Sequence, residues 1–153
     1  MAVTVKRITL WRAEVQNQPG VLANAPEPLA RAGADLRLVM GYRFPTTPEH
    51  AAIEVYPVSG KKARAAAQEA GLGEAAHIPC LLVEGDNRPG LGARIARGLA
   101  DANVNVAFLV AQVLGRKFSA MVGFDDEQGA SQAVRIIKQA TAPAPARRPQ
   151  RRR

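Results

Sequence analysis

The stretch GDNRPGLGARI, residues 85–95, places polar residues and a Pro-Gly pair between an apolar run and a helix-like segment. A helix that begins after such a turn offers the free N–H groups of Gly90 and the two residues after it, which favour a carboxylate by about 0.3–1 kcal/mol. Gly90 also permits a positive φ and a close approach of the backbone, while Pro89 rigidifies the turn. Asn87 carries both a donor and an acceptor. The pattern therefore predicts a loop that binds the polar end of a small molecule such as an amino acid.

A second interpretation of this loop needs no ligand. Pro-Gly with a neighbouring Asn is also typical of a tight turn from strand to helix, in which Asn87 caps its own loop. Arg88 is equally ambiguous, because it can pair with a ligand carboxylate or remain solvated. Both interpretations stay open on the sequence alone.

The same pattern occurs earlier in the chain, which indicates an internal duplication. At an offset of 70 residues, identical residues align: Glu14, Asn17, Pro19, Gly20, Ala23, Leu29, Ala30 and Ala32 with Glu84, Asn87, Pro89, Gly90, Ala93, Leu99, Ala100 and Ala102. We predict two domains, 1–75 and 76–140, each too small to be certain of folding alone, so that the halves pack on each other.

Each half carries the pattern of an α+β domain. The first half reads as alternating strands and helices at about 6–15, up to 32, 35–43, 50–57 and 60–71, and the second half repeats it. Apolar residues at helical spacing give each helix one apolar face. Ser59 and either Asp125 or Asp126 are candidate N-caps. The order predicts two ferredoxin-like βαββαβ repeats with antiparallel sheets and the helices on one face.

Three features depart from a regular repeat. Pro26 and Pro28 cannot both lie inside a helix, so the first helix is expected to start late, with Asn24 or Ala25 near its cap. The second half lacks a last strand, which either residues 1–5 or residues 75–84 can supply. The predicted strand 104–114 is apolar on both faces, so its helix-free face needs a cover from another sheet or another protomer.

The sequence resembles the ACT domain, a small-molecule-binding regulatory module of amino-acid metabolism. The resemblance is carried by NQPGVL with LARAGADL in the first half and by NRPGLG with LADANVNV in the second. It implies a ligand held between this loop of one domain and the second strand of a neighbouring domain. The implied ligand-binding residues are Asn87, Arg88, Pro89, Gly90, Leu91, Gly92 and Asn105, with Val106 and Ala107, and in the first half Asn17, Gln18, Gly20, Val21 and Asp35, with Leu36 and Arg37. The second loop is the stronger candidate, because Gln18 stands in place of Arg88 and prolines disturb the first helix.

Catalytic and metal chemistry have little support in the sequence. His50 and His77 have no cysteine or carboxylate at ligand spacing, and the acidic residues 125–127 suit a helix N-terminus better than a cation. Cys80 is expected to be buried and inert. The segment GLGARI has Ile95 where a dinucleotide fingerprint needs its third glycine. We expect no enzyme activity, no cofactor and no metal.

The net charge of +8 is concentrated at one end of the chain. Five arginines lie in residues 147–153, and the Pro- and Ala-rich tail 141–153 is expected to be disordered. The RRM shares the βαββαβ order, but Ser119 and Met121 occupy the positions where its third strand needs base-stacking aromatics. Specific nucleic-acid binding is therefore not expected, although the tail can bind nonspecifically. No apolar run is long enough to span a membrane, and a cytoplasmic location is expected.

These observations predict a small regulatory protein that binds an amino acid or similar metabolite at the interface of tandem ACT-like domains. A homodimer is expected, and the signal is expected to pass to a protein partner or to the oligomer by differential binding. A ligand-independent protein-interaction module is the first alternative, and nucleic-acid binding through the tail is the second.

Overall fold

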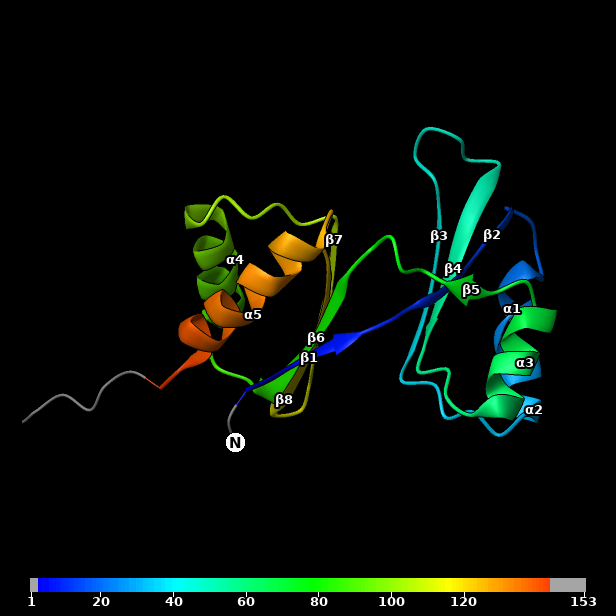
Figure 1. Cartoon of the computed structure of the whole chain (residues 1–153), viewed down its shortest axis with the longest axis horizontal. Coiled ribbons are helices and arrows are strands. Elements are labelled where there is room, and N and C mark those ends of the chain that lie inside the picture. The colour runs from blue at the N-terminus through cyan, green and yellow to red at the C-terminus, as the bar shows by residue number, and fades with distance from the viewer. Residues whose placement is uncertain (1–2, 144–153) are drawn as a thin grey trace, which may run out of the picture. The chain divides into compact units, whose positions relative to one another are not determined.

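The computed structural model describes residues 3–143 of the chain and divides into two compact units (Figure 1). The first unit is Ile8–Cys80. The second unit combines the start of the chain, up to Arg7, with the part that begins at Leu81. Relative to the expected division after residue 75, the first strand of the chain thus belongs with the second repeat.

The first unit contains one four-stranded sheet of order β3-β4-β2-β5. Its elements are β2 (Trp11–Gln16), α1 (Val21–Asn24), α2 (Pro26–Arg31), β3 (Leu38–Arg43), β4 (His50–Tyr56), α3 (Lys61–Glu69) and β5 (Gly73–Glu74). In Figure 1 the three helices lie on one side of the sheet. Trp11, Ile53 and Val55 on the strands pack with Leu29 and Ala67 on the helices to form the core.

The second unit repeats this plan with longer helices. Its elements are β1 (Thr4–Ile8), β6 (Cys80–Asp86), α4 (Leu91–Asp101), β7 (Phe108–Leu114), β8 (Lys117–Gly123) and α5 (Glu127–Thr141), and the sheet order is β1-β6-β8-β7. Helices α4 and α5 lie on one side of the sheet in Figure 1. Leu81, Leu91, Val122, Phe124 and Ile137 belong to the core between the two layers. The α+β fold of two ferredoxin-like repeats with antiparallel sheets and helices on one face is confirmed.

The start of the chain differs from the single strand expected at 6–15. That segment is two strands, β1 and β2, which belong to different sheets. Between them Leu10 is fully buried, and its carbonyl accepts a hydrogen bond from the Ala75 N–H at 2.8 Å. Strand β1 lies beside β6 and so supplies the missing strand of the second sheet, as the first of the two alternatives proposed.

The helix starts agree with the sequence at two places and differ at one. Pro26 stands in the first turn of α2 behind an N-cap at Ala25, as the two prolines required, although the four-residue α1 precedes it. Asp126 caps α5, and its Oδ1 accepts a hydrogen bond from the Gly129 N–H at 2.7 Å. The expected N-cap Ser59 is wrong, because the chain passes through Gly60 at a φ of 82° before α3 begins.

Candidate functional site

The second Pro-Gly loop joins β6 to α4 and has the predicted backbone geometry. Gly90 has a φ of 77° and is the N-cap residue of α4, so no side chain caps the start of this helix. The Asn87 N–H donates to the Arg116 carbonyl at 2.8 Å, which ties the loop to the β7–β8 turn. Leu91 is buried in the core of the unit, while Pro89 and Gly92 are exposed. A Cβ added at Gly92 would meet no atom within 4 Å.

A cavity of about 380 Å³ opens beside this loop, within the second unit. One wall is α4, from Leu91 to Ala96, and the other is formed by the side chains of β7 and β8 that face the helices. Asn87 stands at the end of the cavity that lies next to the loop. Gln112 also lines the cavity, but its side chain alternates with Ala111 and Val113 and belongs to the other face of β7. The volume falls within the range of about 300–1,000 Å³ that is typical of small-molecule pockets.

Not every predicted residue of this loop lines the cavity. The structure brings Asn87, Leu91 and Gly92 together around it. Arg88 instead donates from Nη2 to the Thr141 carbonyl at 2.8 Å and so satisfies the C-terminal end of α5. Asn105 donates from Nδ2 to Asp125 Oδ2 at 2.7 Å, in the segment that precedes β7. Arg88 and Asn105 therefore have structural partners of their own.

The first Pro-Gly loop uses its asparagine differently. Asn17 donates from Nδ2 to the Pro48 carbonyl at 2.9 Å and from its N–H to the Glu49 carbonyl at 2.7 Å. The Gln18 carbonyl accepts from the Val21 N–H at 3.4 Å, and Gly20 has a φ of 94°. The Asn17 amide is thus occupied by its own unit, as the interpretation without a ligand expects. Asp35 is exposed and lines a separate surface hollow of this unit near Lys61.

Several residues of the cavity were not predicted from the sequence. They lie on β7 and β8 and comprise Leu109, Ala111, Gln112, Val113, Phe118, Ala120 and Val122. The signal for β7 was its apolar character on both faces. Since alternation along a strand does not reveal which face meets a helix, the sequence could not assign these side chains to a pocket.

Comparison with solved structures finds proteins of similar fold. The regulatory subunit of aspartate kinase from Thermus thermophilus, in its ligand-free form, matches with a TM-score of 0.60 over 93% of this chain and 98% of that chain at 17% identity. The corresponding subunit from Thermus flavus gives 0.56 over 92% and 97% at 18% identity. A protein from Bacteroides thetaiotaomicron gives 0.70 over 86% and 88% at 12% identity. This chain has an ACT-like fold, that of aspartate kinase regulatory subunits.

At these identities the similarity defines the ACT-like fold and not the ligand. No family model matches the sequence. Comparison with curated protein sequences also finds no significant match. What the ACT-like fold of this chain does must therefore be argued from its own residues.

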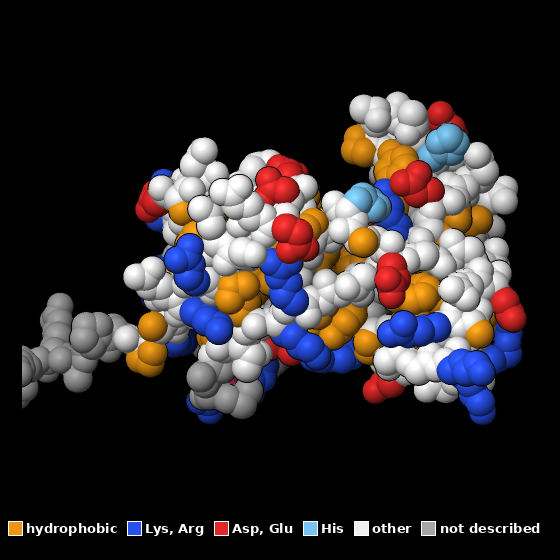
Figure 2. Space-filling view, viewed as in Figure 1, with side chains coloured by type: hydrophobic (Ala, Val, Ile, Leu, Met, Phe, Trp, Pro, Cys, Tyr) orange, Lys and Arg blue, Asp and Glu red, His pale blue; other side chains and the backbone are white. Residues whose placement is uncertain are grey.

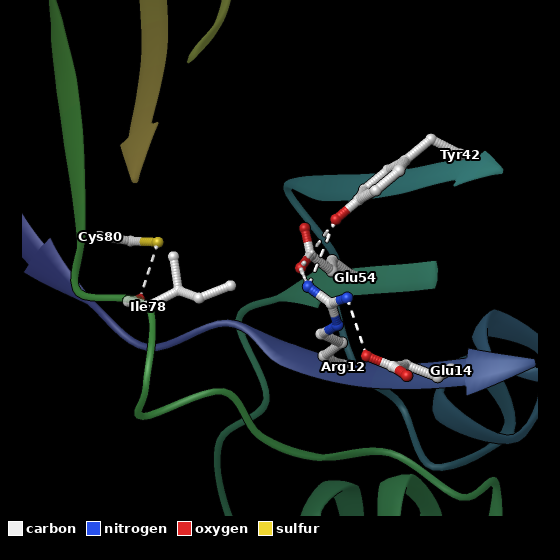
Figure 3. Close-up of polar contacts among 6 residues, drawn as sticks. All are labelled: Arg12, Glu14, Tyr42, Glu54, Ile78 and Cys80. Atoms are coloured by element: carbon white, nitrogen blue, oxygen red, sulfur yellow. Dashed lines mark hydrogen bonds and ion pairs between the residues drawn. The ribbon is translucent and has the colours of Figure 1, made fainter. Parts of the chain in front are cut away.

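The first unit of the ACT-like fold holds a buried polar cluster (Figure 3). Glu54 on β4 is fully buried and accepts a hydrogen bond from Arg12 Nη1 at 3.1 Å and a longer one from the Tyr42 hydroxyl at 3.5 Å. Arg12 also pairs with Glu14 at 3.0 Å and lies over the ring of Phe44. Burial raises the pKa of Glu54, and the nearby Arg12 charge opposes that rise. The Glu54 carboxyl group is thus buried inside the unit and is paired there with the Arg12 guanidinium.

Cys80 has the buried position that the sequence predicted. Cys80 is buried, and its thiol donates to the Ile78 carbonyl at 3.3 Å (Figure 3). Burial, with a contribution from the charge of Glu54, raises the pKa of the Cys80 thiol to about 12. Within residues 3–143 no group of three or more His, Cys, Asp or Glu side chains is placed to hold a metal ion. No helix in the described part of the chain is long and apolar enough to cross a membrane.

Proposed function

We propose that this protein is a small regulatory protein that binds an amino acid or a similar metabolite at the second Pro-Gly loop. The observation that carries the proposal is the cavity beside Asn87, because it joins a polar loop to an apolar interior within the second unit. The resemblance had instead implied a ligand between this loop and a strand of a neighbouring domain. The fold shared with aspartate kinase regulatory subunits supports a regulatory role.

The loop supplies recognition of the ligand's polar end. Asn87 has an amide that can donate to a carboxylate or accept from an amino group. The N–H groups of Gly92 and Ala93 belong to the first turn of α4 and have no partner within that helix. The macrodipole of an eleven-residue helix adds a modest preference for negative charge at the same end.

Such a sensor passes its signal on when the ligand binds one state of the protein more tightly than another. Leu109 and Val113 line the cavity and also belong to the exposed surface of β7, where they are 53% and 52% exposed. A ligand that contacts these two side chains changes the surface that β7 offers to a partner. Binding then favours one state of the β7 surface over another by the difference in affinity.

A thermal-shift screen of the twenty amino acids tests the proposal. At 100 times its dissociation constant, a ligand that binds only the folded state adds about 2.7 kcal/mol of stability. We expect selective stabilisation by one or a few amino acids and its loss in Asn87→Ala. A flat screen across all twenty would count against a sensor of amino acids.

Asn17→Ala is the matched control for that variant. Because the Asn17 amide donates to Pro48, its loss is expected to destabilise the first loop by about 0.5–1.5 kcal/mol. The thermal shift produced by the amino acid should nevertheless persist in Asn17→Ala. Loss of the shift in both variants would show that Asn87 acts through general stability and not through the ligand.

We propose that the exposed edge of β7 is the surface that a second copy of the chain covers. Strand β7 is an edge strand of its sheet, and Leu109, Val110, Val113 and Leu114 are all exposed on it. An apolar edge strand with free backbone groups is a template for pairing with another strand. Antiparallel pairing of two β7 strands would use that edge and cover side chains on both faces of the sheet.

Lysine substitutions on β7 test this arrangement. Val110→Lys with Leu114→Lys should weaken self-association at least about tenfold, because facing lysines repel and keep their charge in water. Sedimentation equilibrium gives the association constant. Ala65→Lys, at an exposed position of α3, is the control and should leave it unchanged. A wild-type chain that is monomeric at high concentration would refute the proposal.

Specific nucleic-acid binding gains no support from the described residues. Met121 is buried and Ser119 is half-buried on β8, so this central strand presents no aromatic platform. On the face that Figure 2 shows, Lys and Arg side chains are interspersed with Asp and Glu. The arginines of the predicted basic tail lie outside the described residues.

A further inference from the structure

The two repeats differ in the first helical turn after their Pro-Gly loops. The offset of 70 that aligns Asn17 with Asn87 also aligns Leu22 with Gly92 and Gly41 with Ala111. Each pair joins the first turn after the loop to the edge strand of the same unit, since α1 faces β3 in one unit and α4 faces β7 in the other. In the first repeat the larger residue of the pair is on the helix, and in the second repeat it is on the strand.

In the first unit the contact is closed by a side chain. Leu22 lies across β3, and its Cδ1 would be only 3.0 Å from a Cβ added at Gly41. A Cβ at this position would require the end of the Leu22 side chain to shift by a few tenths of an ångström. Leu22, which is 51% exposed, therefore covers the strand at Gly41 from the helix side.

In the second unit the same place is open. Gly92 brings no side chain, a Cβ there would meet nothing within 4 Å, and Ala111 on the strand adds only a methyl group. The cavity of about 380 Å³ lies at this position, with both Gly92 and Ala111 in its lining. The glycine at position 92 is thus the local difference that leaves the space between α4 and β7 unfilled.

The walls of the cavity define the chemistry of an occupant. Within the described residues none of the residues that line it is charged. Asn87 is polar, and so is Gln112, whose side chain belongs to the face of β7 opposite to Ala111 and Val113. A buried charge without a partner costs several kcal/mol, so the interior disfavours ionised groups. An occupant therefore places an uncharged aliphatic or aromatic group among Ile95, Ala111 and Phe118 and keeps its polar end at Asn87.

We infer that the second repeat carries a binding site for amino acids with uncharged apolar side chains, such as leucine or phenylalanine, and that Leu22 closes the corresponding site in the first repeat. The inference rests on the proposed function and adds the ligand class and a stoichiometry of one ligand per chain. Charged amino acids such as lysine and aspartate are excluded by the walls of the cavity.

Transplanting the Leu-Gly pair into the second repeat tests this inference. In Gly92→Leu with Ala111→Gly, the leucine should lie over the strand as Leu22 does and fill the cavity without disturbing the loop. Isothermal titration with L-leucine, L-phenylalanine, L-lysine and L-aspartate should show that leucine or phenylalanine binds the wild type once per chain, while lysine and aspartate do not bind. The double substitution should weaken that binding at least about 100-fold.

Arg97→Leu is the matched control. It places a leucine at an exposed position of the same helix that does not line the cavity, so it should retain binding within about threefold. The reverse change, Leu22→Gly, should leave the affinity of the second site unchanged.

The outcomes separate this inference from the proposed function. If binding of an amino acid persists in Gly92→Leu with Ala111→Gly, the protein remains a sensor and the assignment of the ligand to this cavity is overturned. The same holds if lysine or aspartate is the amino acid that binds. If none of the twenty amino acids binds, the proposed function fails, and benzene then tests the cavity alone, because apolar cavities accept such probes. Benzene should shift the methyl resonances of Ile95 and Leu109 in the wild type but not in the double variant; unshifted resonances would overturn the inference as well.

Discussion

Replacing Arg12 by methionine is expected to lower the free energy of unfolding of the first unit by about 3–5 kcal/mol at pH 7, because the change leaves a buried carboxylate without its charged partner. Glu54 is fully buried, and Arg12 is 3.1 Å from its Oε1. Tyr42 offers only a long hydrogen bond of 3.5 Å, which cannot replace the guanidinium. Trp11, the single tryptophan, is buried in the same unit, so its fluorescence during urea unfolding reports the change.

Two further variants isolate the cause. Arg12→Met with Glu54→Met removes both charges and should recover most of the lost stability, since a buried ion pair is often replaceable by apolar residues of similar size. Arg64→Met, on the exposed side of α3, is the surface control and should change stability by no more than about 0.5 kcal/mol. If Arg12→Met costs no more than Arg64→Met, Glu54 does not depend on Arg12.

The pH dependence gives the same pair an independent check. Burial raises the pKa of Glu54 in the folded state above its ordinary value, with Arg12 acting in the opposite direction. The folded chain therefore holds this proton more tightly than the unfolded chain, and the stability that Glu54 contributes is present below its ordinary pKa of 4.5 and is lost as the pH rises through the raised value. The stability of the wild type relative to Glu54→Gln should fall as the pH rises above 4.5. A constant difference would contradict the raised pKa.

Much of the fold was available from local patterns in the sequence. The duplicated loop fixed the repeat, and helical spacing identified the apolar face of α4 through Leu91, Ile95 and Leu99, all of which are buried. The two prolines located the start of α2, and Asp126 located the start of α5. These predictions succeeded because each depends on backbone constraints within a few residues.

What the sequence missed depends on partners far apart in the chain. The break at Thr9 and Leu10 cannot be read from the apolar pattern of residues 4–16, because each half pairs with a different sheet. For the same reason the sequence could not decide which of two segments forms the last strand of the second sheet. Strand register and edge position are set by tertiary pairing and not by the strand's own residues.

In the candidate site, too, the sequence predicted local features and missed contacts between distant residues. The sequence located Asn87, Leu91 and Gly92, because a Pro-Gly turn before a helix has a fixed backbone geometry. It did not reveal that Arg88 satisfies the end of α5, since that contact joins residues 53 positions apart. The opposition of Leu22 to Gly92 was visible in the repeat alignment, but its meaning depends on which strand lies opposite each helix.

Deleting residues 1–7 is expected to destabilise the second unit by about 3 kcal/mol or more while leaving the first unit folded. Val3 and Val5 are partly buried against the core of the second unit, so each contributes part of the roughly 1.5–3 kcal/mol of a fully buried valine. The deletion also removes an ion pair between Arg7 and Glu127 and a hydrogen bond from Arg7 to Ser131 at 2.9 Å. It exposes β6, an apolar strand that would become an edge.

Amide hydrogen exchange distinguishes this outcome from general unfolding. Amides of β6 and β8 should lose protection in the deletion variant, while those of β4 should keep it, since β4 lies between β3 and β2 in the other sheet. A peptide of residues 1–9 added in trans should restore protection to β6, because it supplies the missing strand. Lys6→Ala, an exposed change within β1, keeps the strand and should leave every protection factor as in the wild type. Equal loss of protection in both units would mean that β1 stabilises the chain as a whole, and unchanged protection in β6 would mean that the second sheet stands without its first strand.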